Sequence, residues 1–304
     1  MNGFSQSVLF IGAGNMGAPM AMHLLDAGVS LAVADLSPHA LEPFAQRGVP
    51  TAITPTDLPG DVVITILPTD AHVRDALLGP GGALARRKRT IVIEMTSSSP
   101  TATKRLAAEL LELDVPLIDA PVSGGVRGAK SAKLTTMVGG DPQHFERYRA
   151  LLALMCGNIT HVGAVGSGHT LKALNNFLSG ISLWATCEAL LVGSKAGLDL
   201  QTMVDVIHTS SGQTNALDTK IVMSVLPRTF DYGFSMRLIA KDVAIAARLA
   251  RELDVPAPVL AQTEEHWMLA KSELGEDADF SAVMRLLESW AGYELPQTSH
   301  KAFT

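Results

Sequence analysis

The residue best suited to proton transfer is Lys172, which lies in an apolar stretch where charged side chains are scarce. Residues 168–198 carry a helical pattern whose few charges are Lys172, Glu188 and Lys195. Because burial disfavours an ammonium, desolvation would turn this lysine into a general base that works near neutrality. Asn176 is four residues further on, hence on the same helix face, where its amide could hold the lysine and a substrate hydroxyl in register. The alternative is a lysine whose ammonium extends into solvent from a helix end.

A glycine pattern near the N-terminus is suited to binding a diphosphate. Gly12, Gly14 and Gly17 form a G-x-G-x-x-G that directly follows an apolar run and opens a helical pattern. In that context the first glycine permits a tight turn, the second lets backbone approach a pyrophosphate, and the third lets helix pack on strand. Together with Asn15 and Met16, the loop would present free N–H groups at a helix N-terminus to the phosphates. A plain turn between strand and helix is the alternative.

Asp35 stands 18 residues beyond Gly17, where the next apolar run ends. A carboxylate there can accept both hydroxyls of a ribose and would repel a 2′-phosphate, and no arginine follows immediately to neutralise one. We therefore expect NAD to be preferred over NADP, unless Asp35 serves only as a helix cap. Leu67, Pro68 and Thr96 follow two later apolar runs, at the strand ends outside which ligands bind in open α/β sheets, and are expected to contact the cofactor.

Ser123, Gly124 and Gly125 combine a hydroxyl with unobstructed backbone N–H groups after another short apolar run. Such a loop can bind an anion without a cation, which suits a substrate carboxylate. A simple connecting turn is the alternative. Phe234 is open to two interpretations, because it could line the substrate pocket or belong to the core.

Three further segments line up with one family. Residues 119–125 (DAPVSGG) resemble its substrate-binding signature, and residues 168–176 (GHTLKALNN) resemble its catalytic G-x-x-x-K-x-x-x-N. Residues 234–242 are similar to its C-terminal F-x-x-x-L-x-x-K-D. With the glycine pattern, these four motifs in order resemble the β-hydroxyacid dehydrogenases over essentially the full chain. That family includes 3-hydroxyisobutyrate, L-threonate and L-serine dehydrogenases and tartronate semialdehyde reductases.

The resemblance implies hydride transfer between a nicotinamide cofactor and a small 3-hydroxy acid, with Lys172 as general acid/base and Asn176 beside it. It also implies that the 123–125 loop binds the substrate, and that Lys241 lies near the nicotinamide or its ribose with Asp242 in support. A surface ion pair is the alternative for these last two residues. Members of the family are dimers or tetramers, so we expect a homodimer or homotetramer. The acid itself, the nature of its anion (carboxylate or sulfonate) and the physiological direction stay open.

The elements that must position these residues change character halfway along the chain. Short apolar runs typical of strands occupy residues 7–11, 30–34, 61–67, 90–95 and 116–118, with two more at 134–138 and 159–162. Helical patterns lie between them, at 15–27, 38–47, 71–78, 100–113 and 142–155. Continuously apolar strands that alternate with helices are typical of a parallel sheet covered on both faces. We therefore predict an NAD-binding, doubly wound α/β (Rossmann) domain over residues 1–163.

After Gly166 the strand pattern stops. The helical pattern at 168–198 corresponds to a helix of about 45 Å, apolar nearly all round and therefore buried, as the spine between the domains and part of a dimer interface. Further helical patterns follow at 201–208, 242–253, 259–271 and 280–290. We predict an all-α substrate and dimerisation domain over residues 164–304.

Composition argues against several classes of protein. The 24 Lys and Arg against 30 Asp and Glu give a net charge of −6, and the nearest approach to a basic stripe is residues 86–89, interpreted as a solvated turn. Nucleic-acid and membrane partners are therefore not expected. Cys156 and Cys187, both in apolar stretches of helical type, make neither a disulfide framework nor a zinc cluster, and no other cluster has metal-ligand spacing. With no export signal evident, we expect a cytoplasmic protein that needs no metal.

Three alternatives stand beside the dehydrogenase. An aldehyde or imine reductase of the same superfamily would have a similar fold, but imine reductases do without the lysine, so Lys172 argues against them. Decarboxylation of the 6-phosphogluconate type would need a longer helical domain and an Arg/Lys cluster for a phosphate. A catalytically silent NAD-binding interaction module would have no use for Lys172 with Asn176, and a turnover assay distinguishes it.

Overall fold

The computed structural model describes residues 5–85 and 90–299 of the 304-residue chain. The predicted basic turn at residues 86–89 lies outside the described residues. The chain divides into two compact units, Met1–Lys172 and Ala173–Thr304. The predicted boundary between residues 163 and 164 comes earlier, because the first turns of the long helix are bonded to the sheet of the first unit.

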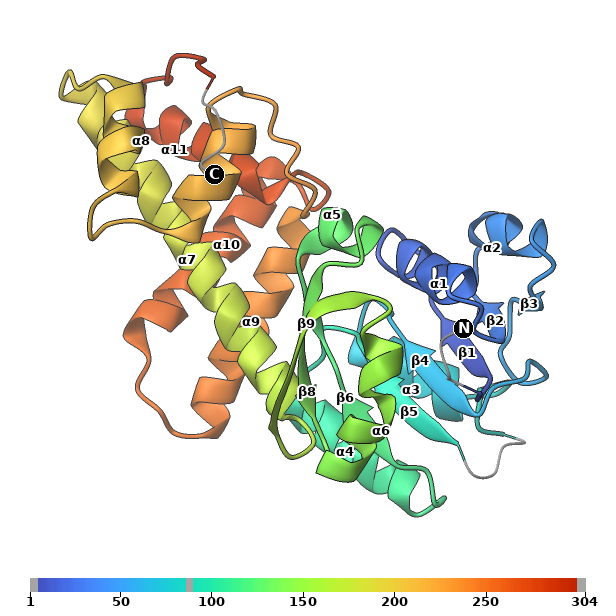
Figure 1. Ribbon diagram of the computed structural model, residues 1–304. Coiled ribbons are helices and arrows are strands. Elements are labelled where there is room, and N and C mark those ends of the chain that lie inside the picture. Colours follow the sequence, from blue (N-terminus) through green and yellow to red (C-terminus); the bar gives the residue numbers. More distant parts are fainter. Residues whose placement is uncertain (1–4, 86–89, 300–304) are drawn as a thin grey trace. The chain divides into compact units, whose positions relative to one another are not determined.

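Among the described residues of the first unit, nine strands form one mixed sheet (Figure 1). Their order is β3-β2-β1-β4-β5-β6-β8-β7, with β9 also paired to β8. The pairs from β3 to β6 are parallel, whereas β8 runs antiparallel to both β6 and β7. The strands are β1 (Val8–Ile11), β2 (Leu31–Ala34), β3 (Thr51–Ala52), β4 (Val62–Thr65), β5 (Ile91–Glu94), β6 (Leu117–Asp119), β7 (Val122–Ser123), β8 (Leu134–Gly139) and β9 (Cys156–Gly163).

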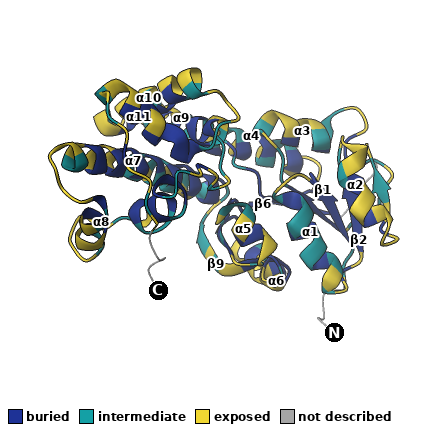
Figure 2. Ribbon diagram, turned by 90° about the horizontal axis from the view of Figure 1, so that it is seen from above, coloured by how far each residue is buried: buried dark blue, intermediate teal, exposed yellow. Residues whose placement is uncertain are grey.

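Helices cover both faces of this sheet, as the apolar strands predict. The strands β1, β2, β4 and β5 are buried throughout (Figure 2). Side chains alternate between two core clusters, with Phe10 and Ile64 in one and Leu9 and Val63 in the other. The helices are α1 (Gly17–Asp26), α2 (Pro38–Ala45), α3 (Asp70–Leu78), α4 (Pro100–Leu111), α5 (Gly125–Lys130) and α6 (Pro142–Leu152). Because α1, α2, α5 and α6 contribute to the first cluster and α3 and α4 to the second, the predicted doubly wound domain is confirmed.

The sequence patterns missed or misplaced several segments of this unit. The short strands β3 and β7 and the short helix α5 were not expected. Cys156 begins β9 instead of lying in a helix, and α6 ends at Leu152. The reason is that β9, among the described strands, pairs only with β8 and exposes polar residues such as Asn158, so it lacks the apolar run of a central strand.

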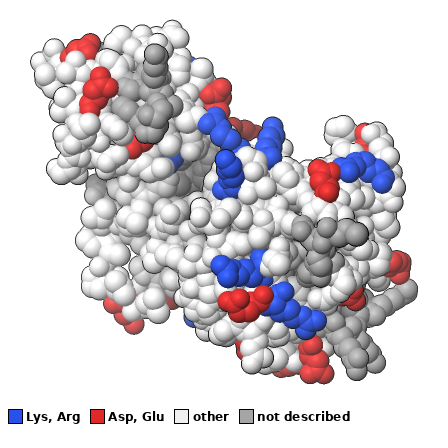
Figure 3. Space-filling model, in the orientation of Figure 1, with Lys and Arg blue, Asp and Glu red and all other residues white. Residues whose placement is uncertain are grey.

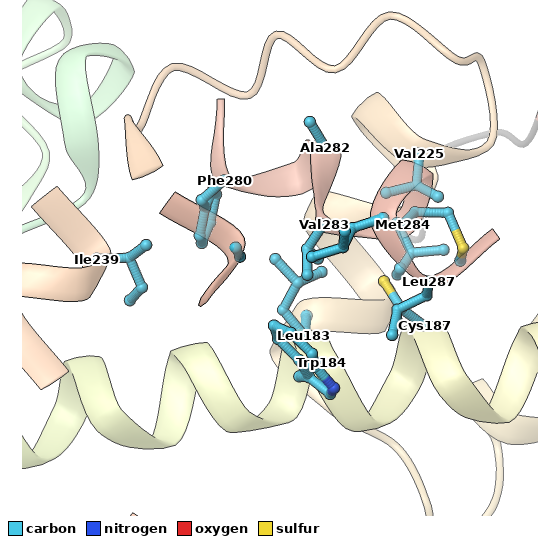
Figure 4. Close-up of a cluster of buried hydrophobic side chains, with 14 of the residues drawn as sticks. Leu183, Trp184, Cys187, Val225, Ile239, Phe280, Ala282, Val283, Met284 and Leu287 are labelled. Atoms are coloured by element: carbon cyan, nitrogen blue, oxygen red, sulfur yellow. The ribbon is translucent and has the colours of Figure 1, made fainter. Parts of the chain in front are cut away.

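Helix α7 (Ser167–Lys195) begins in the first unit and continues into the second. It ends before Gly197, whose φ of +91° lies in the left-handed region that favours glycine. One face of α7 packs on the core of the second unit. There Leu183, Trp184 and Cys187 point from α7 toward side chains of α11 (Figure 4).

The opposite face of α7 is apolar and exposed in the single chain. Leu171, Leu178 and Val192 recur on a seven-residue spacing and are 41%, 59% and 69% exposed, and Ala185, also exposed, continues the row. The helix is therefore buried along one face only. Length and composition alone would let α7 cross a membrane, a test that the core helices of soluble proteins also pass.

The rest of the second unit is helical within the described residues. Its elements are α8 (Leu200–His208), a π-helix η1 (Ala216–Val225), α9 (Met236–Glu252), α10 (Pro258–Leu274), a 3₁₀ turn η2 (Phe280–Ala282) and α11 (Val283–Ala291). The all-α architecture is confirmed, but η1 was not expected, and α9 begins earlier than the predicted residue 242. Its start is fixed by a long-range contact, because the Asp279 carboxylate accepts the N–H groups of Gly233 and Phe234.

Charged side chains do not gather into one basic region on the face drawn in Figure 3. Lys and Arg groups lie there among Asp, Glu and many uncharged side chains. This distribution agrees with the slightly negative net charge of the chain.

Candidate active site

The glycine loop lies at the carboxyl end of β1, where the strand order reverses. β1 has β2 on one side and β4 on the other, and ligands of open α/β sheets bind at such a switch point. Gly12 has a φ of +103°, and a Cβ there would lie 2.2 Å from the carbonyl oxygen of Ile66. A Cβ at Gly17 would lie 1.9 Å from the carbonyl oxygen of Gly12, whereas one at Gly14 would meet nothing within 4 Å. The loop is closed toward the protein and open at Gly14.

The open side of this loop fits the diphosphate of a dinucleotide. Gly14 and Asn15 are exposed, and Met16, which precedes α1, is half-buried. No side chain among the described residues caps the start of α1. In the first turn, Ala18 donates its N–H to the Gly14 carbonyl oxygen at 2.9 Å and Pro19 has no N–H. What favours a phosphate here is therefore the exposed backbone at Gly14 and Asn15 together with the partial positive charge of the helix N-terminus.

Asp35 follows β2 and braces the glycine loop. Its Oδ2 accepts the N–H of Ala13 at 2.6 Å, and its Oδ1 accepts the N–H of Ser37 at 2.8 Å. A carboxylate has about four lone-pair sites. These two bonds therefore leave capacity for the hydroxyls of a ribose.

The loops after β4 and β5 are tied to each other. Thr96 Oγ1 accepts the N–H of Leu67 at 2.9 Å. Leu67 is half-buried and Pro68 is exposed, whereas Thr96 is only 1% exposed. Thr96 thus holds the Leu67 loop in place and offers little surface of its own to a cofactor.

The predicted anion loop follows directly from β7. Ser123, the last residue of β7, is half-buried and pairs with Thr135 of β8. Gly124 and Gly125 have φ values of +126° and +60°, which glycine adopts most readily. The loop therefore combines the Ser123 hydroxyl with two backbone N–H groups that carry no Cβ beside them.

Lys172 lies on the second turn of α7 and is 8% exposed. It closes the first unit, and Asn176, which is 6% exposed, lies one helical turn later in the second. A spacing of four residues places the two on the same helix face. The burial of Lys172 does not fit a lysine that extends into solvent.

In the second unit, Asp242 joins two residues that the sequence singled out. Asn176 Nδ2 donates to Asp242 Oδ2 at 2.5 Å, and Lys241 Nζ lies 3.3 Å from Asp242 Oδ1. Asn175 Nδ2 in turn donates to Asn176 Oδ1 at 3.2 Å. The amide of Asn176 is therefore held at both ends, and the buried Asp242 is the residue that orients it.

Phe234 packs against the core of the second unit. Its ring meets Phe280 edge-on, with centroids 5.4 Å apart, and its N–H donates to Asp279 at 3.1 Å. The side chain is half-buried. Packing against the core accounts for one side of the ring.

Sequence reasoning missed a buried polar cluster at the start of α7. His169, interpreted only as a neighbour of Lys172, lies between two acidic residues. Its Nε2 is 3.4 Å from Glu94 Oε2, and its Nδ1 is 3.6 Å from Asp119 Oδ2. Burial raises the pKa of the Glu94 carboxyl, while the adjacent His169 partly offsets that rise. The available signal was the position of the two acidic residues, since both lie at the carboxyl ends of predicted strands.

Metal and thiol chemistry have little support in the part of the chain that the structure describes. Within residues 5–85 and 90–299, no group of three or more His, Cys, Asp or Glu side chains is arranged to hold a metal ion. Burial raises the pKa of the Cys156 thiol to about 12 and also raises that of Cys187. Neither thiol is therefore an activated nucleophile near neutral pH.

Two family models match the chain in succession. The model described as the NAD binding domain of 6-phosphogluconate dehydrogenase matches residues 7–163. The model described as NAD-binding of NADP-dependent 3-hydroxyisobutyrate dehydrogenase matches residues 166–287. The first match covers the sheet unit with its glycine loop, and the second begins just before α7.

Individual relatives match almost the whole chain. The 2-(hydroxymethyl)glutarate dehydrogenase of Eubacterium barkeri is 34% identical over 287 residues, which cover 93% of this chain and 95% of the relative. The NAD-dependent L-serine dehydrogenase of Pseudomonas aeruginosa is 35% identical over 296 residues, which cover 94% of this chain and 99% of the relative.

Solved structures agree with these sequence matches. The 3-hydroxyisobutyrate dehydrogenase of Mycobacterium tuberculosis, solved with L-serine, has a TM-score of 0.86 at 33% identity and covers 93% of this chain and 99% of its own. An imine reductase of Myxococcus stipitatus shares the fold at a TM-score of 0.64 and 21% identity, covering 93% of this chain and 100% of its own. From its two family models and its full-length relatives, the chain belongs to the β-hydroxyacid dehydrogenase family of NAD(P)-dependent enzymes that act on hydroxy acids.

Proposed function

We propose that this chain transfers a hydride between NAD and a small 3-hydroxy acid, with Lys172 as the general acid/base. The observation that carries the proposal is the burial of Lys172 one helical turn before the buried Asn176. A lysine with no role beyond solubility would extend its ammonium into water. Burial disfavours the charged form of an amine, so a buried lysine can act as a base at a pH closer to neutrality.

The proton balance of the reaction falls to Lys172. In oxidation its amine takes the proton of the substrate hydroxyl, and in reduction its ammonium returns that proton. The chemistry that NAD supplies when bound is acceptance of the hydride from the carbon that carries the hydroxyl. Asn176, oriented by Asp242, would hold the hydroxyl and the lysine in register, while Lys241 would face the nicotinamide ribose.

Asp35 supports a preference for NAD. Its carboxylate would repel a 2′-phosphate, and Leu36, Ser37 and Pro38 follow it without an arginine. One family model is named for an NADP-dependent enzyme and one relative for an NAD-dependent enzyme, so membership leaves the preference open. We expect kcat/KM with NAD to exceed that with NADP by roughly tenfold or more, because juxtaposed like charges cost several kcal/mol. Asp35→Ser would lower the ratio of kcat/KM with NAD to kcat/KM with NADP. Equal kcat/KM values with the two cofactors in the wild type would contradict the proposal.

The substrate class follows from the chemistry that the relatives share. Their names refer to 2-(hydroxymethyl)glutarate, 3-hydroxyisobutyrate and L-serine, which all carry a hydroxyl on the carbon β to a carboxylate. The backbone N–H groups of Gly124 and Gly125, with the Ser123 hydroxyl, suit that carboxylate or a sulfonate. Phe234 is the residue of the helical unit that we propose as an apolar contact of the substrate. L-Threonate and 3-hydroxyisobutyrate are the first acids to test.

The exposed apolar row on α7 supports a homo-oligomer. Its seven-residue spacing is the repeat with which helices pack against each other, and the row would be covered in a homodimer or homotetramer. We expect a particle larger than a monomer in sedimentation equilibrium, and Leu178→Arg to shift it toward the monomer. We further propose a cytoplasmic enzyme without nucleic-acid or membrane partners, in keeping with the net charge of −6.

NADH formation from NAD⁺ at mildly alkaline pH tests the proposed reaction. The panel holds 3-hydroxyisobutyrate, L-threonate, D-glycerate, L-serine, 2-(hydroxymethyl)glutarate and a three-carbon hydroxysulfonate. Lys172→Ala is expected to lower kcat by roughly 10²–10⁴-fold, the usual contribution of general acid–base catalysis. Lys195→Ala is the matched control, because it removes an exposed lysine from the far end of the same helix.

Other outcomes would identify the alternatives. NADH binding without turnover of any panel member would favour the catalytically silent module. Turnover of a cyclic imine or an aldehyde that survives Lys172→Ala would favour a reductase of the imine-reductase type. Loss of turnover in Lys195→Ala equal to that in Lys172→Ala would remove the specific role of Lys172.

A further inference from the structure

The first turn of α7 is fastened to the sheet by a buried group of side chains that the proposed reaction does not use. We call this group the α7 anchor. Its residues are Glu94, Thr96, Thr103, Asp119 and His169, and each is at least nine-tenths buried. All five belong to the same compact unit as Lys172.

Asp119 caps α7 from a different element. Its Oδ1 accepts the N–H of Gly166 at 2.7 Å, and its Oδ2 accepts the N–H of His169 at 2.9 Å. A negative charge at this end of a helix is also favoured by the helix dipole. The carboxylate at the end of β6 therefore fixes where α7 begins.

The imidazole of His169 fixes how α7 is turned about its axis. Its Nε2 lies 2.6 Å from the carbonyl oxygen of Thr96, and because a carbonyl only accepts, Nε2 carries the hydrogen. Its Nδ1 lies 2.9 Å from the Thr103 hydroxyl of α4. Both ring nitrogens are thus occupied, one by the loop after β5 and the other by a neighbouring helix.

The two carboxylates make replacement of the His169 imidazole by a smaller side chain energetically costly. Glu94 Oε2 and Asp119 Oδ2 lie 3.4 Å and 3.6 Å from the ring nitrogens of His169, and the Ser98 hydroxyl donates to Glu94 Oε1 at 2.8 Å. Buried charges are tolerated when they are paired and hydrogen-bonded. Without the ring, two acidic groups would remain buried close to each other.

Backbone packing completes the anchor. A Cβ at Gly168 would lie 2.3 Å from the carbonyl oxygen of Met137, and a Cβ at Gly139 would lie 2.5 Å from Asp119 Oδ1. The first turn of α7 therefore lies directly against β8 and the Asp119 carboxylate. Since a helix is stiff over one turn, the position of His169 determines that of Lys172, three residues later.

We propose that His169 is a positioning residue for Lys172. Through the α7 anchor it sets the place and rotation of the lysine amine, without itself touching substrate or cofactor. This inference rests on the proposed function, because His169 acts through Lys172. The chemistry of proton transfer is unchanged, and only the geometry in which it takes place depends on His169.

The first test compares three single variants. His169→Ala is expected to lower kcat by roughly 10–100-fold, since a misplacement near 1 Å can cost about 10²-fold. His169→Gln should recover much of this loss, because its amide can still donate to the Thr96 carbonyl. His161→Ala is the matched control in the same unit, where His161 Nε2 lies 2.9 Å from the Gly140 carbonyl oxygen, and it should leave kcat within about twofold.

The readout separates positioning from a general loss of structure. We expect KM and the Kd of NADH to change by less than about threefold in His169→Ala, while kcat per NADH-binding site falls. If His169→Ala does not fold, Thr103→Val removes the hydroxyl beside Nδ1 at nearly constant volume and should lower kcat in the same way. An unchanged kcat per binding site in the folded variant would overturn the proposal, as would a drop confined to NADH binding.

A double-variant cycle isolates the route through the lysine. If His169 acts only by placing Lys172, His169→Ala should have no further effect in the Lys172→Ala background. An equal fold loss in both backgrounds would overturn the proposal and indicate a structural role. If Lys172→Ala alone keeps full kcat, the proposed function fails. If Lys172→Ala loses activity while His169→Ala keeps it, only this inference fails.

Discussion

Helix α7 is held in two chemically different ways along its length. Its first turn is fixed to the sheet unit by charged and hydrogen-bonding groups, Asp119 and His169 above all. Its later turns are held in the helical unit by apolar side chains such as Leu183 and Trp184. Hydrogen bonds are directional, whereas burial of apolar surface is not. On our proposal the polar end gives Lys172 its position, whereas the apolar end attaches α7 to the core of the helical unit.

The two ends can be followed separately. The three tryptophans of the chain, Trp184, Trp267 and Trp290, all lie in the helical unit. Tryptophan fluorescence therefore reports unfolding of that unit, while far-UV circular dichroism reports both. A chain with two units need not unfold in one step, so the two signals are to be recorded together.

The largest effect is expected from Asp119→Ala in the sheet unit. This change leaves the N–H groups of Gly166 and His169 without their acceptor and leaves His169 with only one of its two acidic neighbours, Glu94. Removing one partner of a buried pair costs about 3–5 kcal/mol. The circular dichroism transition should shift to lower denaturant concentration by more than the fluorescence transition does.

Asp119→Asn serves as the graded control, because one amide oxygen can replace one of the two acceptors. Its unfolding free energy should lie between that of the wild type and that of Asp119→Ala. A shift of the fluorescence transition by as much as the circular dichroism transition would mean that the anchor stabilises both units equally. That result would contradict the different roles that we assign to the two ends of α7.

A smaller loss is expected from Leu183→Ala at the apolar end. Leu183 is fully buried in the core of the helical unit, and such truncations cost about 2–5 kcal/mol. In this variant the fluorescence transition should shift to lower denaturant concentration by more than the circular dichroism transition does. At low temperature, where the variant is folded, kcat should stay within about twofold of the wild type, because Lys172 keeps its anchor.

Leu253→Ala is the matched control for this variant, since Leu253 is exposed at the end of α9. It should change the unfolding free energy by less than about 0.5 kcal/mol. A fall of kcat in folded Leu183→Ala as large as that in His169→Ala would show that apolar packing, too, positions the lysine.

The sequence was most informative where local patterns and the tertiary environment agree. Strands buried on both faces are continuously apolar, so β1, β2, β4 and β5 could be predicted to within a few residues. The glycine loop could be predicted because Gly12 and Gly17 face backbone atoms that exclude a Cβ. Lys172 stood out because a charge is rare in so apolar a stretch.

The remainder depends on contacts between distant segments. The start of α9 is set by Asp279, more than forty residues beyond Gly233. The α7 anchor joins residues 94, 119 and 169, and no local pattern distinguishes a buried His169 from an exposed one. The π-helix η1 follows no standard helical period, so its buried lysine, Lys220, also escaped notice.

Lys220 is one of the buried charged residues of the helical unit, beside Asp242 and Glu288, and its replacement is expected to stabilise the chain. Its amine donates to Asn215 Oδ1 at 2.8 Å, and burial lowers its pKa from 10.5 to about 8. In the folded state the amine thus loses its proton at lower pH than in the unfolded chain, so stability rises as pH increases from about 8 to about 10.5. Below that window the full penalty, about 3 kcal/mol, is present.

Lys220→Met should therefore raise the unfolding free energy at pH 7 by about 2 kcal/mol, after the loss of the Asn215 bond is subtracted. The gain should shrink toward pH 10 as the wild type itself becomes more stable. Lys195→Met, which replaces an exposed lysine of the same unit, should show no such pH dependence. A difference between Lys220→Met and wild type that is constant from pH 7 to 10 would contradict burial as the cause.

The smallest effect is expected where the two units use the same chemistry. Asp199 caps α8 by accepting the N–H of Thr202 at 2.8 Å, and Asp141 caps α6 by accepting the N–H of Gln143 at 2.7 Å. The N–H and hydroxyl of Thr202 hold the pKa of Asp199 below its ordinary value of 3.8, so the cap stabilises the fold above that pH and is lost as pH falls through the lowered value. Asp199→Ala should lower the midpoint of the fluorescence transition slightly at pH 7 and hardly at all in strong acid. Asp199→Asn should keep most of the stability that the cap contributes, because asparagine also caps helices. Asp141→Ala should instead move only the circular dichroism transition, and a fluorescence shift of equal size in both alanine variants would mean that the two units unfold together.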